Sequence, residues 1–287
     1  MLTLLFDGIA YGMLLFVLAV GLAVTLGLMN FINLAHGAFA MAGGYITVLA
    51  MNKLGVPFLA TLPLAFVGTA LIGAVLEPLL YRRLYGKPHL DQVLFSIGLV
   101  FMAITGVDYI IGSTQQNITL PLFLQGRFDI AWVGVGKYRL FIIVVCAALT
   151  LALQWVLTNT RFGSQLRASV DDPRVAGGLG LNVNRIFLFT FAMGSGLAGL
   201  GGALGAEILG LDPGFPLKFM IYFLIVVSVG GTTTLTGPLL AALLLGIADV
   251  AGKYYVPKLG AFIVYTLMIV ILLVRPQGLF ARAGGGK

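Results

Sequence analysis

The sequence has few charged side chains and almost none of the residues from which catalytic or metal sites are built. Charged residues make up 9% of the 287 residues, and hydrophobic residues make up 60%. Soluble domains carry about 25% charged residues, so this composition excludes an ordinary soluble domain. There are two histidines, His36 and His89, and one cysteine, Cys146. A single cysteine excludes an internal disulfide, and no Cys/His spacing typical of zinc sites is present.

The sequence also lacks the motifs of nucleotide binding and of nucleophilic catalysis. No G-x-x-x-x-G-K-[ST] pattern occurs, so the chain is not predicted to bind ATP through a P-loop. The Gly194-Ser195-Gly196 stretch departs from the G-x-S-x-G pattern and has no evident base. Small residues at helical spacing around it favour a face on which membrane helices pack closely. We therefore expect no catalytic residue, no metal and no cofactor in this chain.

What the chain does contain is a series of long apolar runs. A helix needs about 20 apolar residues to cross a bilayer, and these runs do not alternate as barrel strands would. We predict an all-α polytopic membrane protein with about eight to nine transmembrane or half-membrane helices in one domain, 1–287. The net charge of +7 is then expected in cytoplasmic loops, not at a nucleic-acid surface. No Lys or Arg precedes Lys53, so the first run is expected to be a span and not a cleaved signal peptide.

Small polar residues interrupt two of the apolar runs. The first interruption, N-F-I-N-L-A-H-G at 30–37, is followed by a short Gly- and Ala-rich segment. The second lies in V-S-V-G-G-T-T-T-L-T-G-P-L-L-A-A-L-L-L-G at 227–246 and has a similar form, which suggests an internal repeat. Repeated broken helices are typical of transporter cores. The alternative is a plain turn at the membrane surface.

Acidic residues near or within apolar runs are costly and are therefore candidates for a functional role. Four such residues lie towards the ends of runs, where they can reach interfacial water: Glu77, Asp108, Glu207 and Asp249.

Residues 112–138 differ from the rest of the chain. A polar stretch at 113–119 is followed by R-F-D-I-A-W-V-G-V-G-K-Y, whose short alternation predicts a small β-hairpin. We take the basic, tyrosine-flanked boundary at 81–88 as cytoplasmic. Counting spans from there places the 112–138 loop outside and 161–185 inside. On this topology ten of the 17 Lys and Arg residues lie inside and seven outside.

The longest polar segment, 161–181, separates two charge-free runs at 140–160 and 186–206. Within it, Asp171 and Asp172 precede Pro173, and Arg174 opens a short run that ends at two glycines. Acidic residues followed by proline are signals of a helix N-terminus. We therefore predict a short helix lying along the membrane surface. The alternative is an ordinary amphipathic loop.

Six motifs, in order along nearly the whole chain, resemble those of permease subunits of branched-chain amino-acid ABC transporters, the first of the two paired permeases more than the second. They are I-N-L-A-H-G-A-F-x-M-x-G-G-Y at 32–45, Y-R-R-L-Y-G-K at 81–87, R-F-G-x-x-x-R-A-x-x-x-D-P-x-x-A-x-x-L-G-L-N-V at 161–183, G-x-P-L-K-F at 214–219, G-G-T-x-x-L-x-G-P at 230–238 and R-P-Q-G-L-F at 275–280. One departure concerns Glu77. The family often has arginine directly after this residue, whereas here Pro78 follows and leaves Glu77 without an adjacent basic partner.

The resemblance implies a binding-protein-dependent importer in the bacterial inner membrane. Its partners would be a second homologous permease, two cytoplasmic ATPase subunits that bind the ATP, a periplasmic substrate-binding protein and the lipid bilayer. The coupling helix would map onto 168–181, with ATPase contacts from Arg167, Asp171, Asp172, Pro173 and Arg174. Candidate residues of the translocation pathway are Asn30, Asn33, His36 and Glu207.

The resemblance leaves the substrate open. Such permeases carry Leu, Ile and Val, other amino acids including aromatic ones, urea and short amides, and some carboxylates. A stand-alone secondary transporter or channel is the alternative of another class, and it would work without an ATPase. An intramembrane enzyme would need a catalytic pair that the sequence does not offer.

Overall fold

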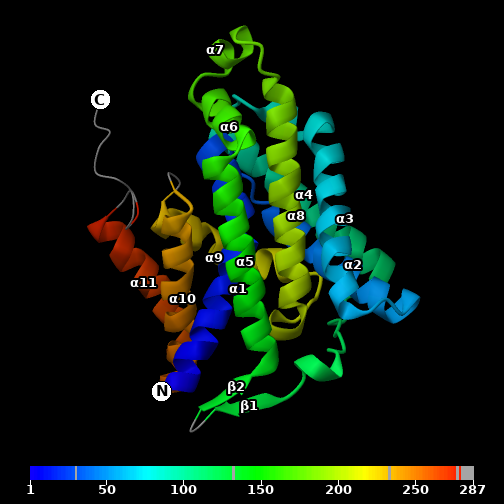
Figure 1. Cartoon of the computed structure of the whole chain (residues 1–287), viewed down its shortest axis with the longest axis vertical. Coiled ribbons are helices and arrows are strands. Elements are labelled where there is room, and N and C mark those ends of the chain that lie inside the picture. The colour runs from blue at the N-terminus through cyan, green and yellow to red at the C-terminus, as the bar shows by residue number, and fades with distance from the viewer. Residues whose placement is uncertain (30, 131–132, 232–233, 276–277, 279–287) are drawn as a thin grey trace.

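The structure is a computed structural model that describes residues 1–29, 31–130, 133–231, 234–275 and 278. Its elements in chain order are α1 (Leu2–Met29), α2 (His36–Leu54), α3 (Phe58–Leu79), η1 (Tyr81–Leu84), α4 (His89–Ile111), η2 (Leu122–Leu124), β1 (Arg127–Ile130), β2 (Val133–Gly136), α5 (Lys137–Asn159), α6 (Arg161–Asp171), α7 (Pro173–Gly178), α8 (Val183–Leu209), α9 (Phe215–Gly230), α10 (Thr236–Tyr255), η3 (Pro257–Leu259) and α11 (Gly260–Val274). They form an elongated helical bundle (Figure 1).

Six helices of the described chain are long and apolar enough to cross a membrane: Leu2–Gly27, Phe58–Leu79, His89–Ile111, Lys137–Asn159, Val183–Leu209 and Thr236–Tyr255. Two shorter apolar helices accompany them, Phe215–Gly230 and Phe262–Val274. These lengths and compositions confirm the prediction of a largely helical, multi-pass membrane protein. The helix count of eight to nine stays a prediction.

Helices α1 and α8 form the centre of the bundle. In the most apolar 18-residue segment of α1, 89% of the residues are buried, and in that of α8, 72% are buried. In the corresponding segment of α4 only 11% are buried. The exposed faces of α4 and α5 carry large apolar side chains, including Phe101, Val144 and Leu151. In a multi-pass protein such faces are expected to contact lipid or another subunit.

Glycines let the central helices approach one another closely. A Cβ atom at Gly43 of α2 would clash with the backbone of Gly199 of α8. A Cβ atom at Gly12 of α1 would lie 2.8 Å from the Cα of Leu243 on α10. The small-residue face predicted around Ser195 is therefore confirmed as a packing face: Ser195 is buried, and its hydroxyl donates to the Phe191 carbonyl at 2.9 Å.

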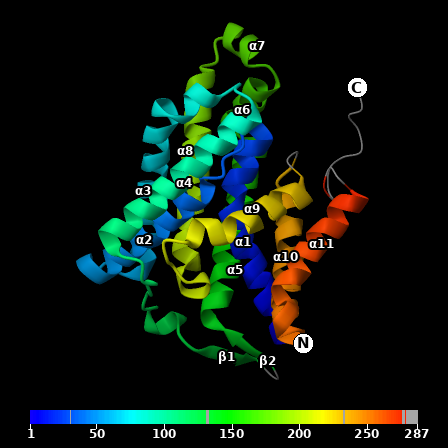
Figure 2. The same ribbon diagram turned by 180° about the vertical axis from the view of Figure 1, so that it is seen from behind.

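The two ends of the bundle carry different structures. The antiparallel β1–β2 hairpin, paired from Arg127↔Gly136 to Ile130↔Val133, lies at the end that holds the N-terminus (Figure 1). Helices α6 and α7 project at the opposite end, and the turn between α3 and α4 lies on that side too (Figure 2). The predicted two-stranded hairpin is confirmed. Tyr138, at the start of α5, donates a hydrogen bond to the Leu204 carbonyl near the end of α8 at 2.6 Å, which shows that these helices run antiparallel.

Both predicted interruptions occur where expected. Residues 31–35 separate α1 from α2, and a non-helical stretch that begins at Gly231 separates α9 from α10. Gly231 has a φ of +80°, a left-handed conformation that favours glycine. The internal repeat itself stays a prediction. Asn30, residues 232–233 of the second interruption and most of the 275–280 motif lie outside the described residues.

Candidate functional site

Helix α7 begins at a side-chain cap, as the Asp-Asp-Pro-Arg sequence predicts. The Asp172 carboxylate accepts hydrogen bonds from the backbone N–H groups of Arg174 at 2.9 Å and Val175 at 3.0 Å. Pro173 occupies the first turn, where its missing N–H costs nothing. A cap of this kind satisfies N–H groups that have no partner inside the helix. The short helix predicted for this segment is confirmed, and the loop alternative is wrong.

The surface of α7 is polar with an apolar tip. Asp171, Asp172, Pro173 and Arg174 are all exposed, and of the six helical residues only Ala176 is buried. Leu179, just past the helix, is 78% exposed, and Val175 is 58% exposed. Large apolar side chains at a projecting tip, flanked by charges, are typical of a surface that contacts another protein.

A second helix, α6, connects α7 to the membrane-spanning part. The Asp-Asp-Pro signal marks only the helix that follows it, so α6 itself is not predicted from the sequence. Thr160 caps α6 by accepting a hydrogen bond from the Gly163 N–H at 3.3 Å. Gly163, Leu166 and Ser169 face inward and are buried. The segment 168–181, to which the resemblance assigns a coupling helix, thus comprises the end of α6, the cap residue Asp172, the whole of α7 and the turn at 179–181.

Helix α6 is seated directly on the end of α5. A Cβ atom at Gly163 would lie 2.8 Å from the Cα of Leu157, so only glycine permits this contact. Arg167 donates from Nη1 to the backbone carbonyl of Leu157, which adds a cation at the C-terminus of α5. Arg167 therefore joins α6 to α5, whereas the other four residues predicted for the ATPase contact lie at the end of α6 and the start of α7.

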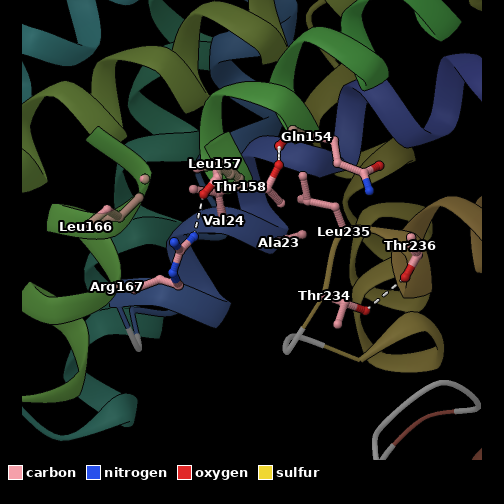
Figure 3. A pocket seen from close by; sticks show the side chains of 11 residues that line it. Ala23, Val24, Gln154, Leu157, Thr158, Leu166, Arg167, Thr234, Leu235 and Thr236 are labelled. Atoms are coloured by element: carbon pink, nitrogen blue, oxygen red, sulfur yellow. Dashed lines mark hydrogen bonds between the residues drawn. The ribbon is translucent and has the colours of Figure 1, made fainter. Parts of the chain in front are cut away.

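A cavity of about 290 Å³ opens beside this joint. Its walls come from α1, α5, α6 and the residues that precede and begin α10 (Figure 3). Thr158 donates to the Gln154 carbonyl at 2.7 Å, and Thr236 donates to the Thr234 hydroxyl at 3.1 Å. Among the described residues that line it, none is acidic and Arg167 is the only charged one. Its described lining combines apolar side chains with hydroxyl, amide and guanidinium groups.

The interruption between α1 and α2 is held by hydrogen bonds from two later segments. The Asn33 side-chain oxygen accepts from the hydroxyl of Tyr81 at 3.2 Å and from the Ala35 N–H at 3.1 Å. The Gln92 side-chain oxygen accepts from the Ile32 N–H at 3.0 Å. Asn33, Tyr81 and Gln92 are all buried, so these hydrogen bonds lie inside the protein.

His36, another candidate pathway residue, is also buried. Its Nε2 atom lies 2.9 Å from the Leu18 carbonyl oxygen, which ties the start of α2 to the middle of α1. Its ring packs edge-on against Phe223 at a centroid distance of 6.2 Å. Asn33 and His36 therefore sit within packed core in this conformation.

Glu207 lies apart from the other candidate pathway residues. It is exposed near the end of α8 and lines a cavity of about 490 Å³ beside the hairpin, together with Arg127 and Arg139. The structure brings Asn33 and His36 to neighbouring positions in the core and leaves Glu207 at the hairpin end.

Glu77 has a basic partner, although this partner is not adjacent in the sequence. The Arg82 guanidinium donates to both carboxylate oxygens of Glu77, at 3.2 and 2.7 Å. The 3-10 turn η1 brings Arg82 back over the end of α3. Hydrogen bonding to Glu77 is the main cause that raises the pKa of Arg82 above its ordinary value. The buried acid is therefore paired at the same end of the bundle as α7.

A second charged region lies at the end that carries the hairpin. We call it the hairpin-end cavity: a space of about 390 Å³ lined by Asp7, Ala10, Tyr11, Arg139, Ile208, Leu209, Lys218, Phe219, Tyr222, Asp249, Val250 and Lys253. Asp7 pairs with Arg139, and Lys218 pairs with Asp212. Asp249 pairs with Lys253 at 2.6 Å. Of these residues, sequence reasoning singled out only Asp249. The sequence does carry a signal for the charged residues of this set, because each is an isolated charge near the end of an apolar run.

The described residues contain no group of three or more His, Cys, Asp or Glu side chains that could hold a metal ion. Cys146 is a free, buried thiol in the middle of α5.

Comparison with known proteins agrees with this architecture. The family model described as the permease component of the branched-chain amino acid transport system matches residues 4–272. The high-affinity branched-chain amino acid transport system permease protein BraD of Pseudomonas aeruginosa is 27% identical over 97% of this chain and 95% of its own length. LivH of Escherichia coli K12, which has the same description, is 26% identical over 97% of this chain and 94% of its own length.

A more distant relative carries a different substrate in its name. The glucose ABC transporter permease protein TsgB13 of Haloferax volcanii is 26% identical over 82% of this chain and 66% of its own length. No solved structure matches the chain. Because the family model spans nearly all of the helices described above, the chain belongs to the family of permease components of branched-chain amino acid transport systems.

Proposed function

We propose that this chain is the membrane permease subunit of a binding-protein-dependent ABC importer that moves branched-chain or related amino acids across the bacterial inner membrane. The observation that carries the proposal is the capped, projecting helix α7, with charged residues at its start and exposed Val175 and Leu179 at its tip. Family membership supports the transporter class, and the relatives BraD and LivH support the substrate class.

In this proposal α7 docks on a separate ATPase subunit, which binds the ATP. Asp171, Asp172, Pro173 and Arg174 lie at or beside the docking surface. Arg167 transmits motion, because it and Gly163 join α6 to the end of α5. Closure of the ATPase dimer would move α6 and α7 as one unit, α5 would follow, and the pathway would switch its open side. The chain itself performs no covalent chemistry.

The proposed orientation puts α7 in the cytoplasm and the hairpin outside. The ten Lys and Arg residues assigned inside, against seven outside, support this arrangement. The segments 161–185 and 112–138 are then the cytoplasmic coupling segment and the external loop of a single transmembrane domain. We also propose that the shorter helices α2, α9 and α11 enter the membrane, which accounts for eight to nine crossings. The two interrupted runs would be the related halves of an internal repeat.

The proposed partners are a second homologous permease, two ATPase subunits, and a periplasmic binding protein that delivers substrate at the hairpin end. Asn33 and His36 belong to the proposed pathway as residues that hold the broken helix, and Glu207 belongs to it as an exposed acid at the entry end. Asn30 lies outside the described residues, and its proposed place in the pathway rests on the sequence alone.

Reconstitution tests the proposal directly. The chain is coexpressed with the permease, ATPase and binding-protein genes beside it, purified, and placed in proteoliposomes. Uptake of L-leucine that requires the binding protein and ATP is the expected result. Uptake that continues without an ATPase would identify a stand-alone transporter or channel. ATP-dependent uptake of urea, short amides or aromatic amino acids, with none of leucine, isoleucine or valine, would keep the transporter class and replace the substrate.

A further inference from the structure

The hairpin-end cavity has the chemical composition of a small-molecule site. Its volume of about 390 Å³ lies within the range of roughly 300–1,000 Å³ in which proteins bind small ligands. Five helices meet there: α1, α5, α8, α9 and α10. Three basic and two acidic side chains share the space with apolar residues. Five charged side chains in one cavity are a high density for a chain in which only 9% of the residues are charged, and charges inside a membrane protein are candidates for a functional role.

The acidic and basic groups lie at different depths. The Asp249 side chain is 2% exposed and that of Asp7 is 19% exposed. Their partners Lys253 and Arg139 are 55% and 42% exposed, and Lys218 is 60% exposed. The carboxylates thus lie in the interior and the cations lie at the rim. A ligand that carries a positive and a negative group would enter with its positive group first.

One of the deep carboxylates has unused hydrogen-bonding capacity. The Oδ2 atom of Asp7 pairs with Arg139, but its Oδ1 atom is buried and has no donor within the part of the chain that the structure describes. A buried acceptor without a donor is costly. An ammonium group carries three N–H donors and can supply one to this oxygen. The phenol of Tyr222, 3.4 Å from Asp249, offers a further polar contact on the same wall.

Apart from the phenol of Tyr11, the remaining wall is apolar. Ile208 and Leu209 come from the end of α8, Phe219 comes from α9, and Val250 comes from α10. These four residues favour an aliphatic or aromatic side chain and offer no hydrogen-bonding groups from their own side chains for the hydroxyls of a sugar.

We propose that the hairpin-end cavity is a binding subsite for an α-amino acid with an apolar side chain. The ammonium group binds near Asp7 and Asp249, the carboxylate binds near Arg139, Lys218 and Lys253 at the rim, and the side chain lies against the apolar wall. This inference rests on the proposed function, which it deepens by naming the residues that receive the substrate.

The test measures direct binding without the binding protein. The full complex is placed in nanodiscs, and L-[³H]leucine binding is measured by equilibrium dialysis, with competition by 4-methylpentanoate, which lacks the ammonium group, and by isopentylamine, which lacks the carboxylate. Saturable leucine binding is expected, with each analogue competing about tenfold or more weakly, because each loses a charged hydrogen bond.

Asp7→Asn and Lys218→Met should each weaken leucine binding by about tenfold. Lys258→Met, a basic residue of η3 outside the cavity lining, should leave binding unchanged.

Assembly and uptake are measured on the same preparations. Lys218 is exposed, so Lys218→Met is expected to assemble even if Asp7→Asn does not. If leucine uptake requires ATP and the binding protein but no direct binding is found, or if binding is the same in Lys218→Met and Lys258→Met, the subsite is overturned and the proposed function stands. Equal competition by isopentylamine and leucine would likewise overturn it, since the carboxylate would then contribute nothing. Absence of ATP-dependent uptake for every amino acid would instead overturn the proposed function.

Discussion

The carboxylate of Asp172 and the backbone N–H of Arg174 are 2.9 Å apart, and this hydrogen bond starts helix α7. A helix of six residues has too few internal hydrogen bonds to form on its own. Its shape at the projecting end of the molecule therefore depends on the cap, on Pro173 and on the contacts of the segments that flank it.

Replacing Asp172 with alanine should weaken coupling between the permease and its ATPase. The loss of a helix cap costs about 1 kcal/mol, enough to fray a helix this short. Substrate-stimulated ATPase activity of the reconstituted complex should fall severalfold while the subunits still copurify. Asp172→Asn should retain most of the activity, because asparagine caps as well as aspartate does. If substrate stimulates the ATPase activity of Asp172→Ala as much as that of the wild type, the cap has no role in coupling.

Substitution of Gly163 should disturb the joint between α6 and α5. A Cβ atom there would meet the backbone of Leu157, so Gly163→Ala must shift α6 away from α5. We expect reduced uptake and a destabilisation of about 1–3 kcal/mol, as for overpacked sites, measured by thermal unfolding in detergent. Gly106→Ala in α4 is the matched control, since nothing lies within 4 Å of a Cβ at that position. Equal effects of the two substitutions would contradict the tight joint.

The broken helix should depend on the bond between Tyr81 and Asn33. Tyr81→Phe removes one hydrogen bond from a buried acceptor that keeps its bond from Ala35, so a loss of about 1 kcal/mol in stability is expected. Asn33→Ala removes both bonds and should cost more. Tyr109→Phe, at a residue that is 91% exposed, serves as the control. Thermal unfolding of the purified protein measures all three, and a Tyr81→Phe protein as stable as the control would exclude a role for the bond.

The Glu77–Arg82 pair should behave as a coupled unit. Arg82→Met leaves a buried carboxylate without a partner and should cost about 2 kcal/mol or more. Glu77→Gln should cost less, because the Arg82 side chain is 35% exposed and can reach water. The double variant should be more stable than the sum of the two losses implies. Strict additivity in this cycle would show that the pair contributes no coupling energy.

Local features of the structure could be predicted from the sequence, and long-range contacts could not. The α7 cap, the β1–β2 hairpin and the two interruptions each follow from a few adjacent residues. The bonds from Tyr81 to Asn33 and from Arg139 to Asp7 join positions that are distant in sequence. Within long apolar runs, periodicity does not show which helices become neighbours. The hairpin-end cavity was missed for this reason, since its charges come from four helices.

Cysteine labelling tests the orientation of the two ends of the bundle. The natural Cys146 is buried in α5, so the chain already provides a low background for a membrane-impermeant maleimide. Val175→Cys on α7 and Phe128→Cys on β1 replace side chains that are 58% and 50% exposed. In intact cells with a permeable outer membrane, Phe128→Cys should be labelled and Val175→Cys should not. In inside-out vesicles the pattern should reverse. Labelling of Val175→Cys from the periplasmic side would invert the topology, and α7 would then be on the wrong side of the membrane to contact a cytoplasmic ATPase.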